Sequence, residues 1–460
     1  MKTFTVEQMK KLLNGEIIQG SADFQIKNVI FPWHVDDIRS PHTLVFYKNK
    51  RFEWSAIPKN LPLVVVTNKV FAEFRSFSEL IVIKVDDVTK AYWKFVQYYR
   101  SLFDIPVVAV TGTCGKSTTK EMIKHILSAE RKIQATRSSE NSRLLHLSYL
   151  LGIDDSTDAA VFETAVGAPN DLKIAGRYYK PMIGIITNIG EEHLDHCKSI
   201  ETYIQAKADM LNGLNNEGIL ILNADDEKIK TISLADYKGR VVYFSIKKDT
   251  DFYASNICYE NNGMKFTLEF HKMKYPVFVP GYGEHQVYNA LAAIAAVHEL
   301  GIGIKEAGER LKSFVNLKRH IEIVQGISGS TIIDDTWSLN TTSLRAGLKV
   351  LNQMAQGKTR VLFLTDIETL GEMSWKIHKL AEEIIVSEGI DILVTVGDIT
   401  GQMVEHFKTI GLEATVYSLK DCDEAYELLK KILHKDCILL IKGPMFNKSM
   451  AQMAVKLKQQ

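Results

Sequence analysis

The sequence predicts an α/β protein of about three domains, with a parallel sheet in the central domain. At 460 residues the chain is too long for a single hydrophobic core. From residue 107 onward, short apolar runs alternate with stretches of helical spacing, a pattern typical of parallel strands joined by crossover helices. The run at 107–111 leads into a glycine-rich turn and a helix, and ligands of such sheets gather at strand ends of this kind.

The first predicted domain covers residues 1–103 and mixes helices with short strands. Helical spacing indicates helices at 5–13 and 91–103, and the second of these leads to Pro106 at the domain boundary. Apolar runs between the two helices predict strands at 26–31, 44–47, 63–67 and 80–85.

The central predicted domain covers residues 104–315. Its expected parallel strands are 107–111, 159–162, 183–187 and 219–223. Residues 241–280 are rich in β-forming residues, and Asn262-Gly263 between two such runs predicts a hairpin turn in an antiparallel flank. A glycine-rich loop at 280–283 then opens an alanine-rich helix that carries Asn289.

The third predicted domain covers residues 316–460 and alternates strands with helices, without a phosphate loop of its own. Strands are expected at 361–364, 392–396, 414–417 and 437–441, and helices at 342–352, 377–388, 401–410 and 421–433. Its candidate functional residues are Arg319, Asp334, Asp335, Asn340, Asp366, Glu368 and His378. The aspartate pair is equally compatible with a plain turn.

The composition argues against several classes of protein, including nucleic-acid-binding, membrane and disulfide-rich proteins. The chain has 56 basic and 55 acidic residues, so no global field attracts nucleic acid or an anionic membrane. The five cysteines are odd in number and show no CxxC spacing, which argues against a disulfide framework or a structural zinc site. No stretch approaches the length of a membrane span. We therefore expect a cytoplasmic protein with reduced thiols that binds neither nucleic acid nor a membrane. Independently of composition, we expect a monomer that acts on small molecules.

The glycine-rich turn after the first central strand is typical of a phosphate-binding loop. Gly112 and Gly115 let the backbone approach an anion, and the following helix directs its free N–H groups there. Lys116 is expected to bind the phosphates and Ser117 to bind a magnesium ion. The wider spacing of the usual motif would place a glycine at Val110, so an ordinary strand-to-helix turn with a surface lysine is the alternative.

Polar residues follow the other central strands, where a parallel sheet binds its ligands. Glu163 ends one strand, and His193 lies in the loop after the next. A carboxylate beside a phosphate loop is a suitable magnesium ligand, and an imidazole binds a metal directly or through water. Taken singly, each has a structural alternative, a solvated strand end for Glu163 and a loop hydrogen bond for His193. Asn289 could contact a base or ribose, or act only as a helix-cap residue.

Six stretches occur in a distinctive order along the chain. They are Thr111-Gly-Thr-Cys-Gly-Lys-Ser-Thr-Thr-Lys-Glu-Met, Thr187-Asn-Ile-Gly-Glu-Glu-His-Leu, Ala206-Lys-Ala-Asp-Met-Leu, Asn289-Ala-Leu-Ala-Ala, Ile333-Asp-Asp and Asp366-Ile-Glu-Thr-Leu-Gly-Glu. Together they resemble the Mur ligase family over nearly the whole length and in its three-domain order. The closest branch is similar to the one that adds D-alanyl-D-alanine to a UDP-muramoyl tripeptide.

The resemblance implies ATP-dependent amide bond formation through an acyl phosphate, in which a carboxylate substrate is activated and then attacked by an amine. It implies a central ATPase domain between an acceptor-binding N-terminal domain and a Rossmann-like domain for the incoming amino acid or peptide. Two magnesium sites are implied, one held by Ser117 and Glu163, the other by His193 and a carbamylated Lys207. The residues expected at the nucleotide are Gly112, Thr113, Gly115, Lys116, Ser117, Thr118, Asn289, Arg319 and Asp335.

Three stretches depart from the family pattern. Residues 31–41 lack the usual Asp-Ser-Arg and Pro-Gly, the loop after Asp335 reads Thr-Trp-Ser-Leu-Asn-Thr, and Lys442-Gly443 is followed by Pro-Met. The departures fit a paralogue that joins an amino acid to a small carboxylate lacking UDP. A non-catalytic ATP-binding regulatory protein and a nucleotide-driven switch are further alternatives. Without the resemblance, Lys207 on a helix at 202–211 would be interpreted as a surface lysine.

Overall fold

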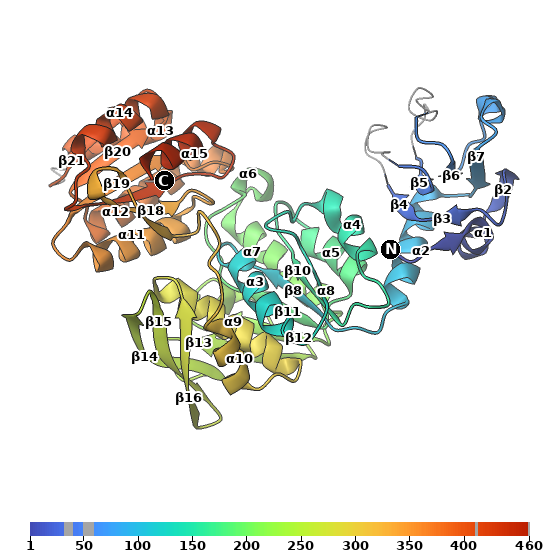
Figure 1. The fold of residues 1–460 in the computed structure, drawn as a ribbon, viewed down its shortest axis with the longest axis horizontal. Helices are drawn as coiled ribbons and strands as arrows, with labels where there is room; N and C mark the ends of the chain where they lie inside the picture. The colour runs from blue at the N-terminus through green and yellow to red at the C-terminus, as the bar shows by residue number, and fades with distance from the viewer. Residues whose placement is uncertain (32–39, 49–58, 410–412, 459–460) are drawn as a thin grey trace. The chain divides into compact units, whose positions relative to one another are not determined.

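The computed structural model describes residues 1–31, 40–48, 59–409 and 413–458 (Figure 1). The chain divides into two compact units. The N-terminal unit contains residues 1–107, 131–162 and 174–181, and the large unit contains residues 108–130, 163–173 and 182–460. The three domain ranges expected from the sequence stay predictions. Most of the stretch 31–41, where the chain departs from the family pattern, lies outside the described residues.

The N-terminal unit contains a sheet with the strand order β2-β7-β6-β5-β4. The strands are β2 (Glu16–Gln19), β7 (Leu80–Lys84), β6 (Leu63–Thr67), β5 (Thr43–Phe46) and β4 (Asn28–Ile30). Only β2 runs antiparallel to its neighbour. Every residue of β5 and β6 is buried, as expected for parallel strands covered on both faces.

Helices and short strands complete this unit. Helix α1 (Val6–Leu13) begins with a capping box formed by Thr5 and Gln8, and α2 (Val88–Ser101) begins at the N-cap Asp87. A two-stranded sheet pairs β1 (Phe4–Thr5) with β3 (Gln25–Ile26). Further along, β9 (Ile133–Ala135) runs parallel to β10 (Ala159–Glu163), and α4 (His146–Leu151) lies between them in the chain.

Three of the parallel strands predicted for the central domain lie side by side in the large unit. Strands β8 (Val107–Thr111), β11 (Ile183–Ile186), β12 (Ile219–Asn223) and β13 (Arg240–Ser245) are parallel neighbours in the order β13-β12-β11-β8. Helix α9 (Glu284–Glu299) packs on this sheet and against α3 (Lys116–Leu127). The alanines of α9 are buried, so small side chains allow close packing. The chain then continues through α10 (Ile304–Leu311).

The antiparallel flank predicted for 241–280 begins later than expected. Its first strand, β13, runs parallel to β12, and the antiparallel part that follows has its turn displaced by one residue. Strands β14 (Phe252–Glu260), β15 (Gly263–Phe270) and β16 (Met273–Pro280) extend the sheet from β13. The turn is Asn261-Asn262 rather than Asn262-Gly263, with positive φ values of 53° and 61°. Asparagine tolerates this conformation, whereas Gly263 is needed within the strand because a Cβ there would collide with the Phe278 ring.

The C-terminal sheet has the order β17-β18-β22-β19-β20-β21. Only β17 (Glu322–Gln325) is antiparallel to its neighbour, β18 (Thr331–Asp335). The remaining strands are β22 (Cys437–Lys442), β19 (Thr359–Thr365), β20 (Ile392–Val396) and β21 (Thr415–Leu419).

Side chains of β19 alternate between two helical layers of this C-terminal sheet. Val361 and Phe363 pack with α14 (Cys422–Ile432) and α15 (Lys448–Leu457). Leu362 and Leu364 pack with α11 (Thr341–Ala355), α12 (Ser374–Glu388) and α13 (Asp398–Thr409). The mixed α/β architecture expected from the sequence is therefore confirmed.

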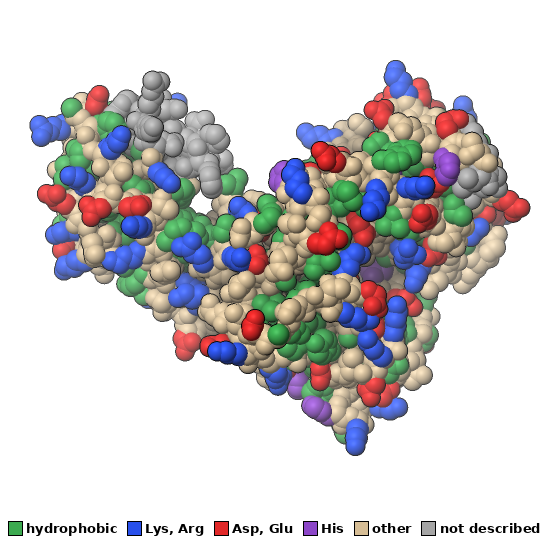
Figure 2. Space-filling model, turned by 180° about the vertical axis from the view of Figure 1, so that it is seen from behind, with side chains coloured by type: hydrophobic (Ala, Val, Ile, Leu, Met, Phe, Trp, Pro, Cys, Tyr) green, Lys and Arg blue, Asp and Glu red, His purple; other side chains and the backbone are tan. Residues whose placement is uncertain are grey.

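The surface agrees with the balanced composition. Figure 2 shows acidic and basic side chains interspersed over the face that it presents. Among the described residues, no helix is long and apolar enough to cross a membrane. All five cysteines lie in the described part of the chain and are free thiols.

Candidate active site

The phosphate loop begins where the buried strand β8 ends. Gly112 and Gly115 have positive φ values of 148° and 81°, a conformation that favours glycine. A Cβ at Gly112 would collide with the Thr187 hydroxyl, and one at Gly115 would collide with the Asn289 side chain. Both glycines are therefore required, and helix α3 starts immediately after them at Lys116.

Two residues at the end of β11 hold this loop in shape. Asn188 Oδ1 accepts a hydrogen bond from the Cys114 amide (2.8 Å), and Asn188 Nδ2 donates to the Cys114 carbonyl (3.0 Å). The Thr187 hydroxyl donates to the same carbonyl (2.6 Å). Both residues begin the stretch Thr187-Asn-Ile-Gly-Glu-Glu-His-Leu that carries the family resemblance, but the sequence did not indicate their contact with Cys114.

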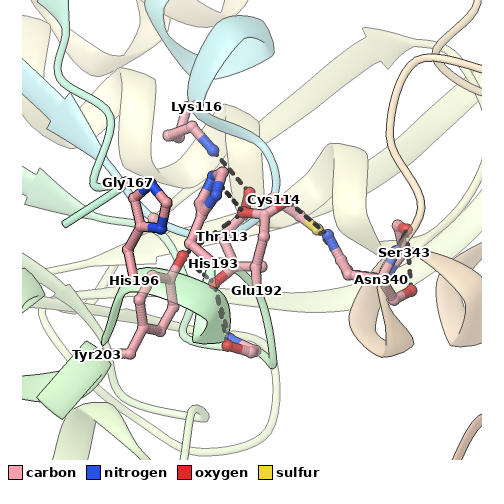
Figure 3. Close-up of polar contacts among 12 residues, drawn as sticks. Thr113, Cys114, Lys116, Gly167, Glu192, His193, His196, Tyr203, Asn340 and Ser343 are labelled. Atoms are coloured by element: carbon pink, nitrogen blue, oxygen red, sulfur yellow. Dashed lines mark hydrogen bonds and ion pairs between the residues drawn. The ribbon is translucent and has the colours of Figure 1, made fainter. Parts of the chain in front are cut away.

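Lys116 lies across the loop, and its Nζ donates to the Thr113 carbonyl at 2.7 Å (Figure 3). Its partner in this bond is a neutral backbone oxygen, so the contact does not neutralise the lysine charge. The loop therefore holds a cation next to backbone N–H groups, which is the arrangement that binds phosphate.

Ser117 and Glu163, the two residues predicted for a magnesium site, are in contact. The Ser117 hydroxyl donates to Glu163 Oε2 at 2.8 Å, and both side chains are buried. Within the described residues, no three His, Cys, Asp or Glu side chains are grouped as a metal site. A cation here would therefore use the serine hydroxyl beside the carboxylate, and hard oxygen donors of this kind suit magnesium.

His193 immediately precedes the short helix α6 (Leu194–Cys197) and has a left-handed backbone with φ 53°. Burial lowers the pKa of its imidazole, and Lys116 and Lys207 lower that pKa further, against the effect of Glu192. The Nε2 atom lies 4.0 Å from Glu192 Oε2. At neutral pH the ring is therefore neutral, the form that binds a metal.

Lys207 on α7 (Ile200–Ala208) is buried, so its interpretation as a surface lysine is wrong. Its Nζ donates to the Gly112 carbonyl at 2.9 Å and lies 4.6 Å from the centre of the Tyr203 ring. Burial lowers the pKa of Lys207 to about 7, with a further contribution from Lys116. A substantial fraction of this amine is therefore neutral at physiological pH.

Three of the residues predicted to contact the nucleotide lie outside the phosphate loop, and each is hydrogen-bonded to another part of the protein. Asn289 Oδ1 accepts a hydrogen bond from Thr119 (3.4 Å), and Asp335 accepts one from Lys442 Nζ (2.6 Å). Arg319 donates through Nε to the Thr336 hydroxyl (2.8 Å) and through a terminal nitrogen to the Thr336 carbonyl (2.6 Å).

A cavity of about 500 Å³ lies within the large unit, and several predicted residues line it. They are Gly115, Thr118, Asn289 and Asp335. The walls also contain residues that the sequence did not indicate, including His285, Tyr288 and Arg345. Burial lowers the pKa of His285 to about 4, and burial together with Asp225 raises the pKa of Tyr288. Both groups are therefore neutral hydrogen-bonding side chains beside the cavity.

Of the other candidates from the C-terminal sequence, Asp366 and His378 are bonded within the protein. Asp366 Oδ1 accepts hydrogen bonds from the Thr400 amide and hydroxyl, both at 2.8 Å. His378 Nε2 accepts one from the Ile367 amide (2.9 Å). Glu368 is exposed. None of these three lines the cavity described above.

Residues 110–297 match the model of the Mur ligase middle domain. The chain is 28% identical over 316 residues to a UDP-N-acetylmuramoyl-tripeptide–D-alanyl-D-alanine ligase of Bacillus subtilis, covering 69% of this chain and 68% of that protein. It is 29% identical over 360 residues to the ligase of the same name from Buchnera aphidicola, covering 78% and 76%.

Solved structures share the fold over almost the full length. MurF from Acinetobacter baumannii has a TM-score of 0.84 at 23% identity and covers 99% of both chains. MurF from Thermotoga maritima in complex with ADP has a TM-score of 0.76 at 17% identity, covering 93% of this chain and 96% of that chain. A pseudomurein peptide ligase type C from Methanothermus fervidus has a TM-score of 0.67 at 20% identity, covering 90% and 94%.

Proposed function

We propose that this Mur ligase is an ATP-dependent enzyme that forms amide bonds between a carboxylate and an amine substrate. Its middle domain and its curated relatives confirm the family that the sequence motifs indicated. The relatives support a MurF-like reaction, in which a dipeptide or amino acid is added to a UDP-muramoyl-peptide-type carboxylate during cell-wall synthesis. The enzyme would act as a monomer in the cytoplasm.

The observation that carries the proposal is the convergence of chemical groups on one phosphate loop. Lys116 bonds to Thr113, Ser117 bonds to Glu163, and Lys207 reaches the Gly112 carbonyl. A cation, a paired hydroxyl and carboxylate, and a buried amine thus surround a single turn. Phosphoryl transfer depends mainly on positioning and charge neutralisation, so these are the groups that such a reaction needs.

The donor set fits ATP and magnesium. Bound magnesium would supply charge neutralisation at the phosphates. Ser117 and Glu163 would hold it through their oxygens, while Lys116 and the loop amides bind the phosphates. The Gly115 end of the loop opens into the cavity that Asn289 and Asp335 also line, and we assign the nucleoside to this space.

We assign Lys207 as the site of a carbamate. The neutral amine attacks CO₂, a C–N bond forms and one proton is released, which leaves a carboxylate on the lysine. With a pKa of about 7, Lys207 reaches its neutral form far more easily than a surface lysine does. Together with His193, the new carboxylate would hold the second magnesium ion. Its negative charge would also compensate nearby Lys116.

We assign the carboxylate substrate to the N-terminal domain, residues 1–103, and the amine to the C-terminal domain, residues 316–460. Shortly after β22, Phe446 is strongly exposed at 77%, and the preceding Lys442-Gly443 is followed by Pro-Met, where the family resemblance implies Ser-Arg. This exposed aromatic side chain favours a second candidate, a Mur-type paralogue that uses a different amine or a carboxylate without UDP.

The test is phosphate release from ATP across pairs of substrates. UDP-muramoyl tripeptide and free dicarboxylates would each be combined with D-alanyl-D-alanine or single amino acids, and products identified by mass spectrometry. Stimulation by UDP-muramoyl tripeptide with D-alanyl-D-alanine supports the MurF-like reaction, and stimulation by another pair supports the paralogue. Tight ATP binding without stimulation by any pair would refute the ligase proposal.

A further inference from the structure

We propose that Asn340 and Glu192 form a positioning pair that couples the start of helix α11 to the phosphate loop. The inference rests on the proposed function, because it assigns a role in the reaction to a contact between the C-terminal and central parts of the large unit. Neither residue touches the predicted phosphate ligands with its own side chain. They act through the loop that carries those ligands.

The oxygen and the nitrogen of the Asn340 side-chain amide both form hydrogen bonds. Its Oδ1 accepts from the Ser343 amide (2.9 Å), which caps helix α11, and from the Cys114 thiol (3.3 Å) in the phosphate loop. Its Nδ2 donates to Glu192 Oε1 at 3.2 Å. The side chain is fully buried, so water does not replace these partners. Figure 3 shows Asn340 facing Cys114 and Glu192 from the side of Ser343.

Glu192 links Asn340 to the phosphate loop through Tyr203. Its other oxygen accepts from the Tyr203 hydroxyl (3.5 Å), and that hydroxyl lies 3.3 Å from the Thr113 hydroxyl. Thr113 in turn accepts through its hydroxyl from the Gly190 amide at 2.8 Å. Asn340 therefore contacts the phosphate loop directly at Cys114 and indirectly at Thr113, whose carbonyl holds Lys116.

The residues that follow Asn340 also hold the start of α11 against the loop after β11. The Thr341 hydroxyl donates to Glu191 at 2.5 Å. A Cβ at Gly190 would collide with the Thr342 hydroxyl, so only glycine allows α11 to approach this closely. Three consecutive residues of the helix start thus contact the loop between β11 and His193. A shift of α11 would therefore move both loops of the site.

The contacts at position 340 require a side chain that both accepts and donates hydrogen bonds. Position 340 must accept hydrogen bonds from the helix and the thiol, and it must donate one to a carboxylate. Asparagine meets both needs, whereas aspartate meets only the first and places a second carboxylate against Glu192. As a helix cap alone, aspartate would serve as well as asparagine. This difference separates a positioning role from a merely structural one.

The test compares Asn340→Asp with a double variant and a matched control. We expect Asn340→Asp to lower kcat by roughly ten- to a hundredfold, because the loop loses one bond and gains a repulsion. Adding Glu192→Gln restores a donor opposite the new carboxylate, and the double variant should recover to within about threefold of wild type. The control, Asn352→Asp, makes the same change on α11 next to Glu388 and should leave kcat unaltered.

A second measurement does not depend on turnover. Hydrogen exchange of residues 112–117 should become faster in Asn340→Asp and return to the wild-type rate in the double variant, while thermal unfolding stays as in the control. Wild-type kcat in Asn340→Asp, or a double variant no better than the single one, would overturn the coupling. If wild type ligates no substrate pair, the proposed function fails, whereas hydrogen exchange still decides whether the coupling exists.

Discussion

The central and C-terminal sheets of the large unit both end their parallel strands in polar residues, but the two edges use these residues differently. At the central edge, Lys116 is bonded to a neutral backbone carbonyl, and Ser117 is bonded to Glu163 beside the loop that we propose binds phosphate. At the C-terminal edge, Asp366 is bonded to the start of α13 and Lys442 to Asp335.

The buried charged groups at the C-terminal edge are bonded to one another or to the backbone. Lys442 Nζ donates to Asp335, to the Ser338 carbonyl (2.9 Å) and to the Ser343 hydroxyl (3.0 Å), which accounts for all three of its donors. The exposed side chains near this edge include two large apolar ones, Trp375 at 55% and Phe446 at 77%, beside exposed charged residues such as Glu368. Strand topology therefore indicates where a ligand could bind, and the hydrogen-bond partners decide whether the side chains are available to it.

If the central edge carries the chemistry, the largest loss of activity is expected on substitution of Lys116. Lys116→Met should lower kcat/KM by roughly a thousandfold, because it removes a cation from developing phosphate charge. Stability should hardly change, since the partner of the lysine is a backbone carbonyl of its own loop. Steady-state kinetics and thermal unfolding would measure the two effects, with Lys124→Met on the same helix as control. Unchanged kcat/KM would remove the phosphate role of Lys116.

Glu163→Gln should have the next largest effect, roughly a hundredfold in kcat. The amide oxygen still accepts from Ser117, so packing is kept and only the charge for the metal is lost. We expect the magnesium concentration for half-maximal rate to rise, which titration with MgCl₂ would measure. Glu130→Gln, an exposed partner of Arg310, provides the control. A normal magnesium dependence in Glu163→Gln would contradict the assignment.

Lys207→Ala should lower the rate roughly ten- to a hundredfold, and short carboxylic acids should partly restore it. The neutral fraction of Lys207 rises as pH increases through its pKa of about 7. Added bicarbonate should therefore activate the wild-type enzyme more at pH 8 than at pH 6, and the alanine variant should not respond. Rates without added bicarbonate, in degassed buffer, give the baseline. Equal bicarbonate responses in both proteins would exclude the carbamate.

The smallest effect on activity is expected at the C-terminal edge. Asp366→Asn should leave kcat/KM within about twofold, but it should lower the free energy of unfolding by about 1–2 kcal/mol, because the cap of α13 is weakened. Urea unfolding would measure this change, with the exposed Glu368→Gln as control. A loss of turnover without a loss of stability would show that this edge also binds a substrate, and the contrast between the edges would fail.

Much of the fold was predictable because its strands are buried on both faces. Strands such as β8 and β12 appear as uninterrupted apolar runs, and each leads into a turn that the sequence also marks. The three-residue edge strand β9 was not predicted. Its side chains are only partly buried, so no apolar pattern distinguishes it from a loop.

The site was predictable where its residues follow strands. Glu163 was indicated by its place at a strand end, the family resemblance paired it with Ser117, and the structure joins the two. The contact between Cys114 and Asn340 was not predictable, because the two residues are 226 positions apart and no local pattern pairs them. The burial of Lys207 also has no local signal, since its helix packs against elements that the sequence does not place beside it.

Arg319 has a left-handed backbone with φ 65°, and its guanidinium is bonded twice to Thr336. An arginine side chain that is free in solution loses rotamer entropy when a ligand fixes it, at a cost of about 1 kcal/mol. Here folding has already fixed the side chain. If Arg319 contacts ATP as expected, the nucleotide meets a preorganised cation, and the entropic cost falls on the stability of the protein instead of on its affinity for ATP.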